Sequence, residues 1–120
     1  MRKTLYIHIG TGKTGTTALQ DFFLLNSEKL QQLGVEYAKT GLVKNNHYLL
    51  CRNYLRKNDE VQAKFFSNLS ELNQEISESN SKSFLISSEY FPGLSPIEIL
   101  ELKNEIKAEI IPIVYLRRQD

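Results

Sequence analysis

The chain has 120 residues, of which 41% are hydrophobic and 24% charged, and its formal net charge at pH 7 is +1. This composition excludes a disordered or fibrous chain, and the small net charge gives no general attraction to nucleic acid or to an anionic membrane. The apolar run after the basic start, Met1 to Lys3, is too short for a signal peptide and is broken by His8 and Gly10. We therefore predict one globular, cytoplasmic domain with no nucleic-acid partner and no membrane span.

The first half of the chain begins with a predicted strand and a predicted helix. Thr4 to Ile9 is a short apolar run that ends at a glycine, which is typical of a buried strand. From Thr16 onward apolar residues recur at helical spacing, and Gly34 marks the end of that helix. Val35 to Ala38 fits a short extended piece. The pair Asn45-Asn46 offers caps for a further helix. Its apolar and aromatic residues are Tyr48, Leu49, Tyr54 and Leu55.

The second half alternates helices with strands. Val61 to Ile76 has one apolar stripe at spacings of three and four, which predicts an amphipathic helix. Ser83 to Ser88 and Ile110 to Leu116 predict two more buried strands. Between them, Ser95 is a helix cap that is followed by proline and, in the first turn, by Glu98. Strands that alternate with helices predict an α/β fold, a three-layer sandwich with a parallel sheet. Ligands bind such sheets beyond the carboxyl ends of the strands.

The segment that links the first strand to the first helix, Gly10 to Thr17, carries the clearest chemical signal. Its glycines let consecutive backbone N–H groups turn inward around an anion. The start of the following helix adds free N–H donors and a favourable dipole. Lys13 adds a positive charge, while Thr14, Thr16 and Thr17 add hydroxyl donors. We therefore predict a site for a phosphate or phosphosulfate group.

The spacing of this loop differs from that of an ATP-binding P-loop, which needs a glycine, four residues and then Gly-Lys-Ser/Thr. Counting from Gly10, the second glycine falls on Gly15, but Thr16 takes the place of the lysine. A motif that ends on Gly12-Lys13 would need a glycine where the chain has Ile7. Without a lysine at the helix start, the usual clamp on the terminal phosphates of ATP is missing.

Lys13 to Thr17 resembles the Lys-Ser/Thr-Gly-Thr-Thr loop of sulfotransferases that use 3′-phosphoadenylyl sulfate (PAPS), and Ile7 to Gln20 is especially similar to bacterial members. The resemblance implies a P-loop-like fold, PAPS as donor, adenosine 3′,5′-bisphosphate (PAP) as product, and no metal. The residues it assigns to the 5′-phosphosulfate are Gly12, Lys13, Thr14, Gly15, Thr16 and Thr17. Many members have proline or histidine at the position of Gly12, and we expect glycine to loosen the loop. Lys13 would also stabilise charge on the leaving group.

Sulfuryl transfer to an alcohol or amine needs a base that takes the proton of the acceptor. Glu89 follows the second strand, in Ser87 to Phe91, which looks like the glutamate-bearing segment of carbohydrate and protein sulfotransferases. A capping or loop carboxylate is the alternative. His47 is the second candidate because histidine titrates near neutral pH, with a substrate-side or structural role as its alternative. We interpret His8 and Cys51 as core residues.

The third predicted strand ends in Arg117, and an arginine there can bind a phosphate through two parallel hydrogen bonds. It resembles the sulfotransferase strand whose arginine contacts the 3′-phosphate of PAPS, with Arg118 as the neighbouring alternative. We expect the chain to be the N-terminal part of a longer sulfotransferase domain that acts on a small-molecule or carbohydrate acceptor. A P-loop-type small-molecule or nucleoside kinase and a non-catalytic nucleotide-binding module remain alternatives, and the oligomeric state stays open.

Overall fold

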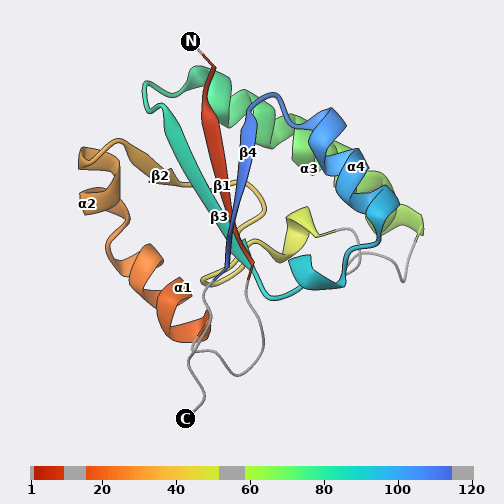
Figure 1. Cartoon of the computed structure of the whole chain (residues 1–120), viewed down its shortest axis with the longest axis horizontal. Helices are drawn as coiled ribbons and strands as arrows, with labels where there is room; N and C mark the ends of the chain where they lie inside the picture. The colour runs from red at the N-terminus through yellow and green to blue at the C-terminus, as the bar shows by residue number, and fades with distance from the viewer. Residues whose placement is uncertain (1, 10–15, 52–58, 115–120) are drawn as a thin grey trace.

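A computed structural model of the chain describes residues 2–9, 16–51 and 59–114, without the side chains of residues 16–17 and 59–63. Its centre is a four-stranded sheet in the order β2-β3-β1-β4, and all three strand pairs are parallel (Figure 1). The strands are β1 (Thr4–Ile9), β2 (Val35–Tyr37), β3 (Ser83–Ser88) and β4 (Glu109–Val114). The predicted α/β fold with a parallel sheet is therefore confirmed, and the short extended piece proves to be the edge strand β2.

Helices cover both faces of the sheet, with α1 and α2 on one side and α3 and α4 on the other (Figure 1). Their bounds are α1 (Thr16–Leu25), α2 (Ser27–Gln32), α3 (Asp59–Glu78) and α4 (Pro96–Glu105). The described residues also form two short 3₁₀ turns, η1 (Tyr48–Leu50) and η2 (Phe91–Gly93). Across the described ranges, no helix combines the length and the apolar character that crossing a membrane requires.

The helix predicted to run unbroken from Thr16 to Gly34 is interrupted at Asn26. The backbone there has φ −106° and ψ 20°, which lies outside the helical region. The Asn26 side chain donates a hydrogen bond to the carbonyl of Phe22 at 2.9 Å. The Asn26 backbone N–H keeps its regular bond to the same carbonyl, at 3.0 Å. Asparagine is a poor helix former, and the chain forms two helices where one was expected.

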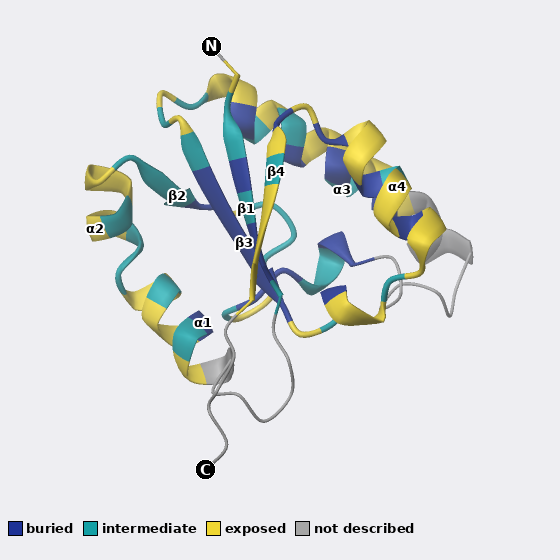
Figure 2. Cartoon of the chain, in the orientation of Figure 1, coloured by how far each residue is buried: buried dark blue, intermediate teal, exposed yellow. Residues whose placement is uncertain are grey.

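The main hydrophobic core lies between the sheet and α3. The residues of β1 and β3 that point to this side are Leu5, Ile7, Phe84 and Ile86. The predicted apolar stripe of α3 is confirmed for its described side chains, Phe65, Leu69, Leu72 and Ile76, which are all buried. The buried inner side of α3 and its exposed outer side can be followed in Figure 2. This core fixes β1 and β3 side by side, so that both strands end at the same edge of the sheet.

The start of α4 follows its sequence signature. The hydroxyl of Ser95 accepts a hydrogen bond from the Glu98 backbone N–H, and the Glu98 carboxylate accepts one from the Ser95 backbone N–H. Pro96 occupies the first helical position, where no N–H is needed. The predicted capping box is therefore confirmed.

Within the described residues, the strand β4 lies at an edge of the sheet. The Glu109 N–H donates a hydrogen bond, 2.9 Å long, to the carbonyl of Lys3, the residue directly before β1. The backbone N–H and C=O of Glu109 therefore face the neighbouring strand. Because backbone groups alternate along a strand, those of Pro112 face the free edge, and proline has no N–H to offer there. The side chains of Ile111, Ile113 and Val114 are 36%, 40% and 48% exposed, and β4 is coloured largely as exposed in Figure 2. Pro112 thus interrupts the row of donors that would otherwise attract another strand.

Candidate functional site

Three strands end side by side at the edge where the sequence predicts the site. Ile9 is the register partner of both Ser88 and Val114, so β1, β3 and β4 reach the same level. The chain leaves β1 directly into the glycine segment, and α1 begins at Thr16. Five of the predicted nucleotide-binding residues lie outside the described residues: Gly12, Lys13, Thr14, Gly15 and Arg117. For Thr16 and Thr17 only the backbone is described, at the N-terminus of α1.

Glu89 lies exposed directly after β3, at the carboxyl edge of the sheet. The Ser88 hydroxyl accepts a hydrogen bond from the Tyr90 N–H at 3.1 Å, which turns the chain at this point. One carboxylate oxygen of Glu89 accepts a bond from the Tyr48 hydroxyl at 3.1 Å, and the rings of Tyr48 and Tyr90 meet edge to face at 5.1 Å. The carboxylate is therefore held at the edge by a neighbouring tyrosine while it stays accessible to an acceptor from solvent.

His47 lies inside the protein, completely buried against β3. Its Nε2 lies 2.7 Å from the Ala38 carbonyl and donates to it, and its Nδ1 accepts the Ser87 N–H at 3.0 Å. The His47 backbone N–H also donates to the Ser87 carbonyl at 2.8 Å. β2 pairs with β3 only as far as Leu85. Beyond this point His47 forms the hydrogen bonds to β3 that a further strand residue would form. This geometry gives it a structural role and leaves neither ring nitrogen for an acceptor.

The same contacts explain the 3₁₀ turn in the described part of the helix that the sequence predicts after Asn45-Asn46; Tyr54 and Leu55 lie outside the described residues. Tyr37 lies at the end of β2, and its hydroxyl donates to the Asn45 carbonyl at 2.6 Å. The ring of Tyr37 packs edge to face on His47 at 4.7 Å. Within the described part of this segment, the chain is tied to β3 and to Tyr37, so that only Tyr48–Leu50 forms a turn of helix.

Lowering the pH from 7 to 4 is expected to remove about 3 kcal/mol of unfolding free energy through His47. Burial lowers the pKa of His47 from 6.5 to about 4. Between these two values the unfolded chain binds a proton that the folded chain does not, so stability is lost as the pH falls. Urea unfolding at pH 7, 6 and 5 measures the slope above the range in which most carboxylates titrate.

The matched variants are His47→Asn, which should flatten this slope, and His8→Asn. Burial lowers the pKa of His8 as well, so His8 contributes in the same direction. If His47→Asn kept the wild-type slope and His8→Asn flattened it, the pH dependence would come from His8, and the assignment to His47 would be wrong.

His8 and Cys51 are both core residues, as the sequence predicts. The His8 Nδ1 lies 2.7 Å from the hydroxyl of Ser87, which also accepts the Gln20 amide of α1 at 3.0 Å. These contacts connect β1, β3 and α1, while the His8 Nε2 has no hydrogen-bond partner within the described ranges. Cys51 is fully buried, and burial raises the pKa of its thiol to about 12, so it is protonated and unreactive at neutral pH.

No protein-family model, curated protein or solved structure matches this chain. The interpretation of the site therefore depends on its own residues and on the sequence pattern of the glycine segment.

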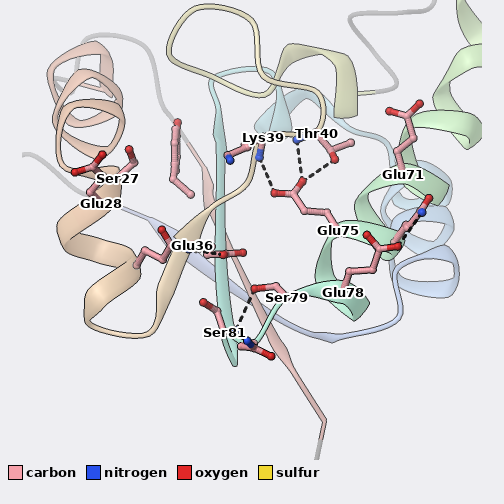
Figure 3. Close-up of a pocket in the computed structure, with 14 residues that line it drawn as sticks. Ser27, Glu28, Glu36, Lys39, Thr40, Glu71, Glu75, Glu78, Ser79 and Ser81 are labelled. Carbon is pink, nitrogen blue, oxygen red and sulfur yellow. Dashed lines mark hydrogen bonds between the residues drawn. The ribbon is translucent and has the colours of Figure 1, made fainter.

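A polar groove of about 890 Å³ lies away from this edge, between α2, β2 and the C-terminal half of α3 (Figure 3). Five glutamates line it: Glu28, Glu36, Glu71, Glu75 and Glu78. Glu75 accepts three hydrogen bonds, from the backbone N–H groups of Lys39 and Thr40 and from the Thr40 hydroxyl. This carboxylate fixes the chain after β2. Because the groove is strongly acidic, it repels phosphate and is no candidate for the nucleotide site.

Tyr48 is the site residue that the sequence did not predict, since it was expected only as part of a helix. Its contact with Glu89 spans 41 positions of the chain. No local pattern around Tyr48 indicates this contact. A different signal lies at the end of β3, where Ser87 and Ser88 follow three apolar residues. Both serines are fully buried, and their side chains point to opposite faces. The Ser87 hydroxyl accepts a hydrogen bond from Gln20 of α1 on one face of the sheet. The Ser88 hydroxyl accepts one from the Tyr90 N–H and so shapes the turn that carries Glu89.

Proposed function

We propose that the chain binds PAPS and transfers its sulfuryl group to an acceptor hydroxyl or amine. In this proposal, residues 12–17 hold the 5′-phosphosulfate, Arg117 holds the 3′-phosphate, and Glu89 takes the proton of the acceptor. The acceptor is a small molecule or a carbohydrate, the reaction needs no metal, and the chain acts in the cytoplasm as part of a longer sulfotransferase domain.

One observation carries the proposal: Lys13 precedes the last glycine of a segment that joins the end of β1 to the start of α1. The N-terminus of this ten-residue helix faces the carboxyl edge of the sheet, where its free N–H groups favour an anion. A lysine inside the loop suits a phosphosulfate, whereas the ATP clamp needs a lysine at the helix start.

The choice between the two predicted bases follows from accessibility. Glu89 is exposed at the edge where three strands end, and a carboxylate there can reach an acceptor that approaches the donor. His47 uses both ring nitrogens inside the protein. We therefore propose Glu89 as the base and assign to His47 the support of the chain beside β3.

Lys13→Ala is expected to abolish the stabilisation of the chain by PAP. A ligand at a hundredfold excess over its dissociation constant adds about 2.7 kcal/mol to the unfolding free energy of a protein that binds it only when folded. Removing the lysine removes the ammonium that pairs with the 5′-phosphate. Thermal unfolding with PAP, PAPS and ATP measures the effect, and Lys29→Ala is the control because this exposed lysine lies on α2.

Two outcomes would favour one of the alternative functions over sulfuryl transfer. Equal stabilisation by ATP, without preference for the 3′-phosphate, would contradict the proposal and favour the kinase alternative. Binding of PAP without transfer to any acceptor would leave the chain as a non-catalytic nucleotide-binding module.

A further inference from the structure

A second hollow lies on the face of the sheet opposite to α1, between the strands β1 and β4 and the helix α4. Its volume is about 670 Å³, within the range of about 300–1,000 Å³ that is usual for ligand pockets. Ile7, Ile9 and Ile110 form its floor, and Ile99 and Leu102 of α4 form its wall. We call this hollow the α4 groove. Its lining is mostly apolar, so it suits an apolar occupant and not a nucleotide.

The α4 groove is long and incompletely covered. It extends from Arg2, just before β1, to Ile9 at the end of that strand. Seven residue steps along a strand correspond to about 23 Å. Ile99, in the helix that forms the wall, is 52% exposed. An elongated apolar body would remove this surface from water, at a gain of about 25 cal/mol per Å² of apolar area.

Charge is concentrated at one end of the α4 groove. Arg2 and Lys103 lie there, together with Glu109 and the neutral Asn104. Among the described residues, neither Arg2 nor Lys103 has an ion-pair or hydrogen-bond partner for its side-chain cation. Two cations and one carboxylate leave this end with a net positive charge, which favours an anionic head group over a cationic one.

We propose that the α4 groove binds one monomeric long-chain amphiphile with an anionic head, of the fatty-acid class. The apolar chain lies along β1 and β4 beneath α4, and the carboxylate lies between Arg2 and Lys103. This site lies on the opposite face of the sheet from α1, and its occupation does not depend on the proposed sulfuryl transfer.

Isothermal titration of the whole chain with dodecanoate, dodecylamine and dodecanol, each below its aggregation concentration, tests the proposal. We expect saturable binding of one dodecanoate, about tenfold tighter than that of dodecylamine, a difference that one charge interaction readily supplies. Lys103→Glu should weaken dodecanoate about tenfold. Lys107→Glu is its control, because this exposed lysine follows α4 and does not line the groove.

A second pair of variants tests the apolar part of the site. Ile99→Asp places a charge in the wall of the groove and should weaken dodecanoate about tenfold. Ile97→Asp is the matched control, since Ile97 is 73% exposed on the same helix and lies outside the groove. Both side chains are exposed, so both variants should fold, which circular dichroism verifies.

Three results would overturn the proposal. The first is the absence of saturable dodecanoate binding, as expected if another polypeptide segment fills the groove. The second is binding of dodecylamine as tight as that of dodecanoate. The third is an equal loss of binding in Ile97→Asp and Ile99→Asp, which would place the amphiphile on the outer surface of α4.

Discussion

Glu89→Gln is expected to lower the rate of sulfuryl transfer by about 10²- to 10⁴-fold, the usual contribution of a general base. Glutamine keeps the size of the side chain and can still accept the hydrogen bond of the Tyr48 hydroxyl, but it cannot take a proton. PAP should therefore bind the variant as it binds the wild type. Transfer of labelled sulfate from PAPS to phenolic and carbohydrate acceptors gives the rate, and thermal unfolding with PAP gives the binding.

The control for this variant is Glu105→Gln, at the exposed end of α4. It removes an equal charge from a place that faces neither the edge of the sheet nor Tyr48. Undiminished transfer by Glu89→Gln would exclude Glu89 as the base and make it the loop carboxylate that the sequence also allowed. A loss of PAP binding in the same variant would show that the carboxylate organises the nucleotide site instead.

Phe65→Ala is expected to lower the unfolding free energy by about 3–5 kcal/mol. Phe65 is completely buried where α3 packs on the sheet, within the same core as Phe84 and Leu69. Its removal leaves a cavity in addition to the lost burial of the ring. A domain of this size has a total stability of about 5–15 kcal/mol, so the variant loses a large share of it. Urea unfolding followed by circular dichroism measures the change.

The neighbouring Phe66 supplies the comparison. It is 43% exposed, and its ring meets that of Phe65 edge to face at 5.3 Å. Phe66→Ala should cost about 1–2 kcal/mol, less than Phe65→Ala, because a large part of the Phe66 ring is already in contact with water. Equal losses for the two variants would contradict the assignment of the Phe65 face of α3 to the core.

The sequence predicted the strands of the sheet because their signal is local, but its expectation that the last of them is buried was wrong. The described side chains of β4 are mostly exposed because this strand lies at an edge of the sheet. β3 has the bounds that were predicted around its apolar centre, Ser83–Ser88, and the capping box at Ser95 places the start of α4 without ambiguity. β2 was foreseen only as an extended piece, since Val35–Tyr37 is too short to show a period. The break at Asn26 was missed because the apolar spacing continues across it.

The sequence predicted those parts of the candidate site whose functional residues are close together in the chain or directly follow a strand. The glycine segment and Glu89 follow strand ends, and their position relative to the sheet can be deduced from parallel order. The role of His47 depends on contacts with Ala38 and Ser87, nine and forty positions away. A sequence pattern contains no record of such distant contacts, so the choice between base and structural residue needed the fold.

The order of the strands has a consequence for how this protein forms. β1 is synthesised before both of its neighbours in the sheet, and His8 finds its partner Ser87 only 79 positions later. Until β3 has been made, β1 has no neighbour in the sheet, and its apolar side chains Leu5 and Ile7 have no core to enter. Contacts this far apart in the chain are slow to form. We therefore expect folding to wait for the second half of the chain, with a nascent chain that depends on chaperones until then.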